Sequence, residues 1–269
     1  MTWLYVTLGV IAALAVIYLI LIAPGKKKNI NEYKSTLFAH RGLHNAQRAE
    51  NSMSAFAAAV EKGYGIELDV RLSKDKKLVV FHDDTLTRVA KIEGRVDECT
   101  AEELGAMSLA GTADGVPLFE DVLKLVGGRV PLLVEIKEDA GKSEVSSAAA
   151  EALKSYTGPY IVESFNPLSL ANARKHLPEA TYGILSQNYY RYENYRKPLY
   201  FALGALLTNR ICKPAFIAYD HRDYKSVSFR IAKHLFGAAT FAWTVRSAEE
   251  EAAARAHGFD SVIFENYLP

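Results

Sequence analysis

Residues 66–84, IELDVRLSKDKKLVVFHDD, contain two apolar, β-branched runs that carry charged side chains. Glu67 and Asp69 lie within the first run, and the second run ends in His82 and Asp83. A strand that is buried on both faces is normally a nearly continuous row of Val, Ile and Leu, because an unpaired buried carboxylate is unfavourable. These acids therefore lie on an exposed edge or converge on a partner such as a cation.

Strand-like runs alternate with helix-like segments along most of the chain. We expect nine strands, at 37–40, 66–70, 78–82, 132–136, 160–164, 181–185, 215–219, 240–245 and 261–264. We expect helices at 52–62, 101–106, 118–126, 144–155, 167–176, 223–236 and 247–257. This alternation favours an α/β fold with a parallel sheet, and residues 35–269 are enough for a (β/α)8 TIM barrel, which typically needs about 250 residues. One of the nine strands then lies outside the barrel, and the segments 181–185 and 215–219 are the weakest barrel candidates.

The connection between the strands at 66–70 and 78–82 is unusually short. Residues 71–77 contain no helical pattern and are fewer than the dozen or more of an ordinary parallel crossover. We expect two parallel barrel strands joined by an extended segment, since an antiparallel hairpin would prevent Glu67, Asp69 and His82 from reaching one rim. Residues 84–130 exceed one βα unit and are expected to form a small insertion after the third strand.

Charged or polar residues follow or end most of the apolar runs on their carboxyl side. The ends of parallel barrel strands surround the active site in TIM-barrel enzymes. Residues two apart share a face of a strand, so Glu67 and Asp69 point the same way, as do Glu135 and Lys137. The polar strand ends are His40 with Arg41, Glu67 with Asp69, His82, Glu135 with Lys137, and Glu163.

Three of these carboxylates, Glu67, Asp69 and Glu135, would repel one another in a single barrel mouth unless a cation lay among them. Hard oxygen ligands suit Mg²⁺ or Ca²⁺ rather than zinc. An ion-pair network with Arg41, Arg71 and Lys137 is the alternative, and the residues alone leave it open.

Two histidines, His40 and His82, end different strands beside the expected acidic cluster. Histidine titrates nearest neutrality, so this pair is a candidate for a general base and a general acid. The sequence leaves open which histidine takes which role.

The first 25 residues are expected to form a single transmembrane anchor. From Trp3 to Ala23 every residue is apolar, Gly or Thr, and about 20 such residues span a bilayer as a helix. A cleaved signal peptide is the alternative, but no basic residue precedes the run. Lys26, Lys27 and Lys28 follow it, so the positive-inside rule places the domain at 35–269 on the cytoplasmic side of a cell membrane, after a basic tether at 26–34.

The rest of the composition narrows the choice of partners. The net charge of +1 provides no basic field for nucleic acid. Cys99 and Cys212 form neither a zinc motif nor a disulfide framework. The apolar stretch 199–207 is too short to span a membrane, and we expect an insertion that packs on the domain, with shallow membrane contact as the alternative. Oligomeric state is left open.

An ordered set of motifs resembles the glycerophosphodiester phosphodiesterase family, relatives of phosphoinositide-specific phospholipase C on a (β/α)8 barrel. The resemblance covers roughly residues 35–269. The chain departs from the family pattern at Ala49, where Pro is usual, and in FENYLP (264–269), where Glu265 stands in for an Asp that precedes Pro. The motifs are AHRG (39–42), EN (50–51), IELDV (66–70), VVFHDDTLTR (79–88), LVEIK (133–137), ESF (163–165) and AWTV (242–245).

The resemblance implies metal-dependent hydrolysis of glycerophosphodiesters to glycerol 3-phosphate and an alcohol. Two alternatives stay open: a membrane-anchored lysophospholipase D acting on lysophospholipids, and a barrel that binds phosphodiester headgroups without cleaving them. For Trp243, a place in the barrel core is equally compatible with the sequence. The resemblance implies that Glu67, Asp69 and Glu135 bind one divalent cation, Mg²⁺ or Ca²⁺ with Mn²⁺ as a further option, and that His40 and His82 act as acid and base. It implies that Arg41 and Lys137 neutralise the phosphate, with support from Glu50 and Asn51. Trp243 would line the substrate pocket.

Overall fold

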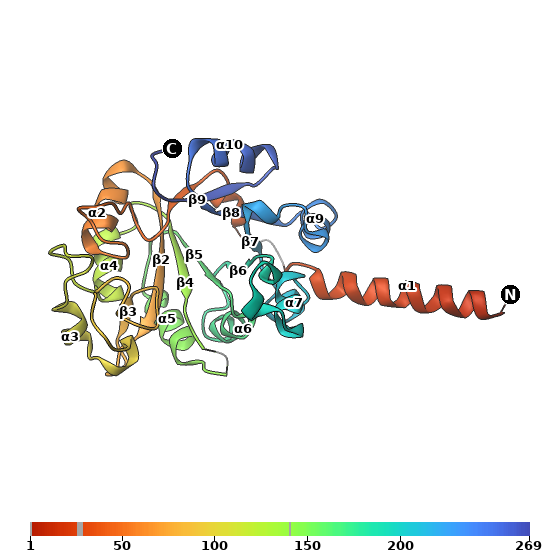
Figure 1. Cartoon of the computed structure of the whole chain (residues 1–269), viewed down its shortest axis with the longest axis horizontal. Coiled ribbons are helices and arrows are strands. Elements are labelled where there is room, and N and C mark those ends of the chain that lie inside the picture. Colours follow the sequence, from red (N-terminus) through yellow and green to blue (C-terminus); the bar gives the residue numbers. More distant parts are fainter. Residues whose placement is uncertain (1, 26–28, 140) are drawn as a thin grey trace.

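A closed barrel of eight parallel strands forms the centre of the molecule (Figure 1). The computed structural model describes residues 2–25, 29–139 and 141–269. Strand β1 pairs in parallel with both β9 and β2, which closes the ring and confirms the predicted TIM barrel. In barrel order the strands are β1 (Leu37–Ala39), β2 (Gly65–Leu72), β4 (Leu132–Ile136), β5 (Tyr160–Ser164), β6 (Tyr182–Ser186), β7 (Phe216–Asp220), β8 (Ala239–Val245) and β9 (Ser261–Phe264).

The ninth strand, β3 (Leu78–Val80), lies outside the barrel and pairs antiparallel with β2, with Val70 opposite Val80 and Leu72 opposite Leu78. The prediction of two parallel strands here is therefore wrong. The turn is tight because the Ser73 N–H donates to the Lys77 carbonyl over 3.0 Å, and the Ser73 hydroxyl accepts from the Lys77 N–H. The two segments judged weakest as barrel strands are the barrel strands β6 and β7.

Helices cover the outside of the barrel, and alternate strand residues pack beneath them. Ile66, Leu68 and Val70 of β2 belong to this outer core. Local signals set the helix ends: the Ser52 side chain caps α2, and Gly63 ends it at a φ of 73°. The helices are α2 (Met53–Lys62), α4 (Phe119–Val126), α5 (Glu144–Lys154), α6 (Pro167–His176), α7 (Pro198–Gly204), α8 (Asn209–Cys212), α9 (Val227–His234) and α10 (Ala248–Ala256).

The barrel interior is apolar toward the amino ends of its strands. Aromatic and aliphatic side chains such as Phe38, Leu133, Phe216 and Phe241 fill it. Short 3-10 helix η1 (Ile30–Tyr33) adds two buried side chains to this core, and the Tyr33 hydroxyl donates to the Tyr160 carbonyl over 3.0 Å. Residues 29–34 of the expected tether thus pack on the barrel, whereas Lys26, Lys27 and Lys28 lie outside the described residues.

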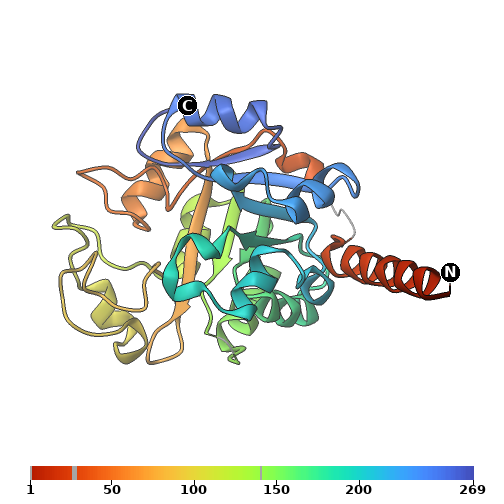
Figure 2. The same ribbon diagram turned by 45° about the vertical axis from the view of Figure 1, so that its right-hand side comes forward.

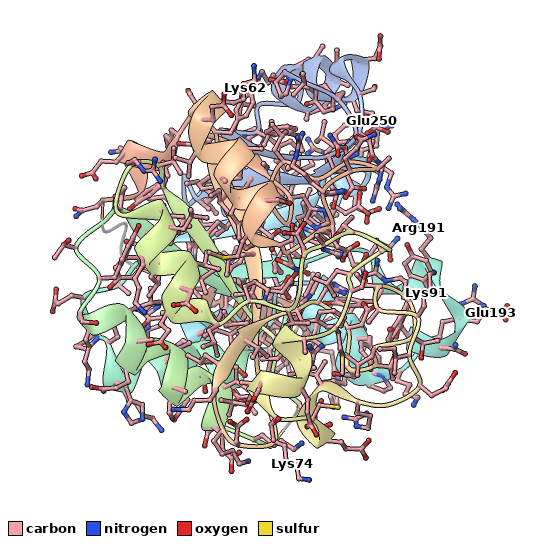
Figure 3. All side chains as sticks on the ribbon, turned by 90° about the vertical axis from the view of Figure 1, so that its left-hand side faces the viewer. Lys62, Lys74, Lys91, Arg191, Glu193 and Glu250 are labelled. Atoms are coloured by element: carbon pink, nitrogen blue, oxygen red, sulfur yellow. The ribbon has the colours of Figure 1, made fainter. Side chains whose placement is uncertain are left out.

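The insertion after β3 has a small core of its own. Phe81, Leu86, Val96 and Leu104 are buried together in this cluster. It contains the 3-10 helix η2 (Val96–Glu98) and helix α3 (Ala101–Gly105), which is closed by a capping box between Thr100 and Glu103. The β2–β3 turn, marked by Lys74, lies at the opposite end of the molecule from α10, marked by Glu250 (Figure 3).

Helix α1 (Thr2–Ile22) projects from the barrel on the side opposite the insertion (Figures 1 and 2). Among the described residues it is the one helix that is long and apolar enough to cross a membrane. Only its last turns pack: Ile22 is fully buried, and its carbonyl accepts a hydrogen bond of 2.8 Å from the Asn209 side chain. The Tyr18 and Ser228 hydroxyls are 2.7 Å apart.

The close packing of Gly183 in β6 on Phe216 in β7 gives a test of the barrel interior. A methyl group at Gly183 would lie 2.2 Å from the Phe216 ring, which is fully buried and stacked on Phe241. We expect Gly183→Ala to lower the free energy of unfolding by about 1–3 kcal/mol, measured by urea denaturation of the full chain in detergent.

Gly105→Ala is the matched control, since its methyl group would meet nothing closer than 3.8 Å. Replacing a helical glycine should leave stability unchanged or raise it by about 0.4–1 kcal/mol. Equal destabilisation by both substitutions would contradict the close packing of Gly183.

Candidate active site

Three carboxylates meet at the carboxyl end of the barrel interior. Glu67 and Asp69 come from β2 and Glu135 from β4, and Asp69 and Glu135 are direct neighbours in the β2–β4 pairing. Their inward orientation follows from strand alternation, because Leu68, between Glu67 and Asp69, and Val134, directly before Glu135, face the outer core. All three are buried, and one oxygen atom from each lies within 4.8 Å of the other two.

The β2–β3 hairpin brings His82 to the same rim. Strand β2 continues past Val70, its last pair with β4, to Leu72, and β3 then returns along it. The Phe81 N–H donates to the Asp69 carbonyl over 2.9 Å, so His82 follows at the level of the acids. The expectation that a hairpin would keep His82 away from the acids is therefore wrong. Strand β2 extends beyond the rim, and β3 runs back along it far enough to return the chain to the rim at His82.

Each of the two histidines has a carboxylate on its Nδ1 atom. His40 Nδ1 is 2.6 Å from Glu265 Oε2, and His82 Nδ1 is 2.5 Å from Asp83 Oδ1. Such partners fix the ring orientation and, in a neutral ring, the tautomer, which leaves Nε2 free for the site. His40 Nε2 lies 4.0 Å from Glu67 Oε2.

Burial shapes the protonation of these histidines. It lowers the pKa of His40 to about 4, although the hydrogen bond to Glu265 opposes the shift. It also lowers the pKa of His82, with Asp69 and Asp83 opposing. Burial alone would raise the pKa of Glu265, but the hydrogen bond and charge of His40 bring it down to about 2. The structure thus presents neutral rings beside ionised partner carboxylates.

Two cations contact the acidic cluster. Lys137 Nζ lies 2.7 Å from Glu135 Oε1 and 3.2 Å from Asp69 Oδ1. Arg41 reaches it twice, with Nε 3.5 Å from Asp69 Oδ2 and a backbone N–H that donates to Glu67 Oε2 over 2.8 Å. Arg71, the third cation of the ion-pair network considered from sequence, does not contact the acidic cluster. It donates hydrogen bonds to Asp84 and to the His82 carbonyl instead.

Backbone strain concentrates beside these contacts. Arg41 and Asn51 adopt left-handed conformations, with φ of 57° and 53°, and the Asn51 N–H donates to the Arg41 carbonyl over 2.9 Å. Asn51 is fully buried, and its amide donates to Asp69 Oδ2 over 2.8 Å. Asn51 therefore orients one of the three acids.

A fourth carboxylate, Glu163 of β5, lies next to Glu135 in the strand pairing and is also buried. Burial and the charges of Glu135 and Glu67 raise its pKa well above the usual value. In the sequence Glu163 ends a strand-like run, but no sequence feature distinguishes it from an ordinary polar residue at the end of a strand. The structure makes Glu163 part of the cluster's electrostatics.

The cluster holds more negative charge than its cations balance. Burial, Asp69 and Glu135 raise the pKa of Glu67, and burial raises that of Glu135 to about 7. Burial would also raise the pKa of Asp69, but Lys137, His82 and Arg41 hold it well below its usual value. Asp69 Oδ1 lacks a hydrogen-bond partner, although Lys137 is near. These oxygens fit a divalent cation of the Mg²⁺ or Ca²⁺ type.

An outer network holds the supporting residues. Arg88 donates to Glu50 over 2.6 and 2.7 Å and to Asp83 over 2.6 Å, and Glu50 also accepts from Arg41 over 2.7 Å. Burial alone would raise the pKa of Glu50, but the hydrogen bonds from Arg88 and the charges of Arg41 and Arg88 lower it to about 2. Asp83 and Arg88 were not recognised from sequence, although both lie in the VVFHDDTLTR motif.

Aromatic side chains border one side of the mouth. Trp243 packs edge-on against Phe165, with ring centroids 5.3 Å apart, and Lys137 Nζ is 5.7 Å from the Phe165 ring. Trp243 is half-buried and contacts the inner core, and its place in a substrate pocket stays a prediction. Phe165 was not recognised individually.

The buried acids and the histidine pair lie at the carboxyl rim of a closed TIM barrel, which is where enzymes with this fold carry their catalytic residues. The sequence profile of the glycerophosphoryl diester phosphodiesterase family matches residues 40–267. The chain therefore belongs to this family and is a phosphoric diester hydrolase.

Individual relatives agree with this placement. A glycerophosphodiester phosphodiesterase of Caldanaerobacter subterraneus subsp. tengcongensis is 35% identical over 167 residues, which cover 57% of this chain and 68% of the relative. The Thermotoga maritima glycerophosphodiester phosphodiesterase structure is 27% identical with a TM-score of 0.67, covering 86% and 94% of the two chains. An Oleispira antarctica phosphodiesterase, solved with the product sn-glycerol-3-phosphate, shares the fold with a TM-score of 0.72 at 22% identity, covering 86% and 93%.

The His40–Glu265 contact predicts a positioning role for Glu265. We expect Glu265→Leu, which removes the acceptor at similar volume, to lower kcat on glycerophosphocholine by about 10–100-fold with a smaller change in KM. Nitrogen-15 NMR of the His40 ring should also show a loss of preference for the Nδ1–H tautomer.

Glu249→Gln on the exposed face of α10 is the control and should change neither measurement. An unchanged kcat in Glu265→Leu together with the original His40 tautomer would contradict the positioning role.

Proposed function

We propose that this chain hydrolyses glycerophosphodiesters to glycerol 3-phosphate and an alcohol with the help of one divalent cation. The observation that carries the proposal is the juxtaposition of a buried triad of acids with two carboxylate-oriented histidines on one rim. The glycerol 3-phosphate bound to the relative from Oleispira antarctica supports the class of product.

The roles of the residues follow from their chemistry. Glu67, Asp69 and Glu135 would hold Mg²⁺ or Ca²⁺, with Mn²⁺ as a third option, and a bound cation would neutralise charge on the phosphate. Arg41 and Lys137 add positive charge from fixed positions, which stabilises the anionic transition state.

The histidines serve proton transfer. A neutral His40 that donates from Nδ1 to Glu265 offers the lone pair of Nε2 to a proton, and His82 has the same arrangement with Asp83. We infer that one ring, neutral at Nε2, takes the proton of the nucleophile, while the other enters the reaction protonated on Nε2 and gives that proton to the leaving alkoxide. Asn51 and Glu50 support the site through Asp69 and Arg41, and Trp243 with Phe165 forms an apolar wall for the substrate.

Membrane anchoring through α1 is part of the proposal. The helix is 21 residues long, uncharged and exposed over most of its length. By the positive-inside rule, the basic residues at 26–28 favour an orientation with the barrel on the cytoplasmic side of a cell membrane. The proposed partners are thus the membrane and a small phosphodiester, with no nucleic acid.

Lysophospholipids are the second candidate substrates, because an anchored barrel meets them at the bilayer surface. Hydrolysis of their phosphodiester would be a lysophospholipase D reaction. A role in binding headgroups without cleavage is less well supported, because the acid triad, both histidines and their partner carboxylates are all in place.

Removal of the metal tests catalysis directly. We expect EDTA to abolish turnover of glycerophosphocholine, and Mg²⁺, Ca²⁺ or Mn²⁺ to restore it. Asp69→Asn should lose metal binding measured by calorimetry, whereas Glu61→Gln on the exposed face of α2 should retain it. Full turnover in EDTA would contradict metal dependence, and metal binding without turnover would favour the headgroup-binding alternative.

Product analysis separates the two substrate classes. With glycerophosphocholine or glycerophosphoethanolamine we expect glycerol 3-phosphate and the free alcohol, detected by mass spectrometry. With lysophosphatidylcholine or lysophosphatidylethanolamine the corresponding product would be lysophosphatidic acid. A higher kcat/KM for the lysolipids would make lysophospholipase D the main activity.

A further inference from the structure

The side of the barrel from which α1 departs exposes an unusual number of apolar side chains. Outside α1, eleven large apolar side chains of the described residues are exposed, and eight of them lie between residues 190 and 235. We define the α1-exit face by five of these, which lie on or next to α7, α8 and α9: Leu199, Phe201, Ile211, Val227 and Leu235. Helix α1 leaves the barrel beside α7 and α9 (Figures 1 and 2).

The α1-exit face is continuous with α1 itself. Tyr18 lines the same groove as Phe201, Leu207 and Val227. The Tyr18 hydroxyl is hydrogen-bonded to the hydroxyl of Ser228 in the first turn of α9. This hydrogen bond holds the carboxyl end of α1 against the barrel. A bilayer that received α1 would therefore begin close to these side chains.

Helix α9 is apolar on two sides. Phe229 and Ala232 face the core of the protein, as expected for a barrel helix. Val227 and Leu235 are 66% and 65% exposed, and the half-buried Ile231 lies between them at helical spacing. The outer side of a helix that covers a barrel in water is normally polar. This second apolar stripe therefore indicates contact with another apolar surface.

The exposed charge around the α1-exit face is predominantly positive, although Asp223 lines the same groove and the exposed Glu193 directly precedes the first segment. Segments 194–219 and 224–236 contain no Asp or Glu, although the whole chain has 31 acidic residues against 32 basic ones. Six exposed basic side chains lie in these two segments: Arg196, Lys197, Arg210, Lys213, Lys225 and Arg230. Apolar side chains surrounded by Lys and Arg match the apolar and anionic layers of a lipid surface.

We propose that the α1-exit face lies on an anionic lipid surface, with the apolar side chains in the headgroup boundary and the basic ones on lipid phosphates. The proposal rests on the membrane anchoring inferred above. A second copy of the chain fits this face less well, because a two-fold contact would bring the same positive patch against itself. The lipid surface satisfies the apolar and the charged residues together.

This orientation connects the membrane with the catalytic mouth. Tyr189, which follows β6, packs against Phe165 at the mouth with ring centroids 6.5 Å apart. It also packs against Tyr200 of α7 at 5.5 Å. A row of aromatic rings therefore leads from Trp243 and Phe165 to the α1-exit face. A phosphodiester in the lipid surface would reach the mouth along this row.

Site-specific quenching in vesicles tests the docking. One new cysteine at a time is placed in the full chain after Cys99→Ser, with Cys212 kept because it is fully buried, and is labelled with an environment-sensitive fluorophore. Phe201→Cys and Val227→Cys report the α1-exit face, and Ile11→Cys reports insertion of α1. Ile92→Cys, 43% exposed in the insertion on the other side of the barrel, is the control (Figure 1). The vesicles contain phosphatidylcholine and phosphatidylglycerol, with a nitroxide on the lipid chains.

We expect the labels at Phe201, Val227 and Ile11 to lose most of their emission, and the label at Ile92 to keep it. The combined substitution Lys197→Glu, Lys225→Glu and Arg230→Glu should restore emission at Phe201 but not at Ile11, since attraction to anionic lipid is lost while the anchor remains. High salt should act in the same direction.

Other outcomes separate the failure of docking from the failure of anchoring. Quenching at Ile11 with full emission at Phe201 and Val227 would overturn the docking and leave the anchor intact. Full emission at Ile11 would overturn the anchoring and the docking together. Emission at Phe201 that responds to protein density instead of nitroxide would show that a second copy covers the face, and would also overturn the proposal.

Discussion

The repulsion among Glu67, Asp69 and Glu135 is the constraint on which the rest of the site depends. Carboxylates at this separation and depth cannot all be ionised without compensating charge. Lys137 and the Arg41 side chain supply part of it, and the Arg41 backbone N–H and the Asn51 amide add hydrogen bonds. Arg41 and Asn51 adopt strained left-handed backbone conformations at the positions where they make these contacts. The remaining imbalance is what a divalent cation would relieve.

Support extends outward from this cluster through charged pairs rather than apolar packing. Arg88 connects Glu50, which holds Arg41, with Asp83, which orients His82. Glu265 orients His40 from the last strand and is held in turn by Arg246. The candidate catalytic groups are thereby positioned at the carboxyl ends of β1, β2, β4 and β9 and after the hairpin strand β3. The apolar core toward the amino ends of the barrel strands supplies stability.

The segment between β6 and β7 contacts both the mouth of the barrel and helix α1. Its tyrosines pack against the mouth at Phe165, and its helix α7 lies beside the departing α1. An anchored enzyme with this arrangement would present its mouth toward lipid-borne phosphodiesters. The aromatic rows and the predominantly positive charge belong to the same side of the molecule as the exposed apolar residues, as the proposed lipid contact requires.

The sequence by itself determined the barrel, the nine strands, most of the helices and the acids and histidines of the rim. Strand periodicity and polar strand ends are local signals, and strand parity sets which side chains share one face of a strand. Only the tertiary structure decided that β3 is antiparallel, that Glu163 joins the acids, that Glu265 orients His40, and that Arg88 holds Asp83 beside His82. These facts depend on contacts between residues far apart in the chain, such as His40 and Glu265, and on how far β2 runs before it turns. No local pattern encodes such distances, because they arise when the ring of strands closes.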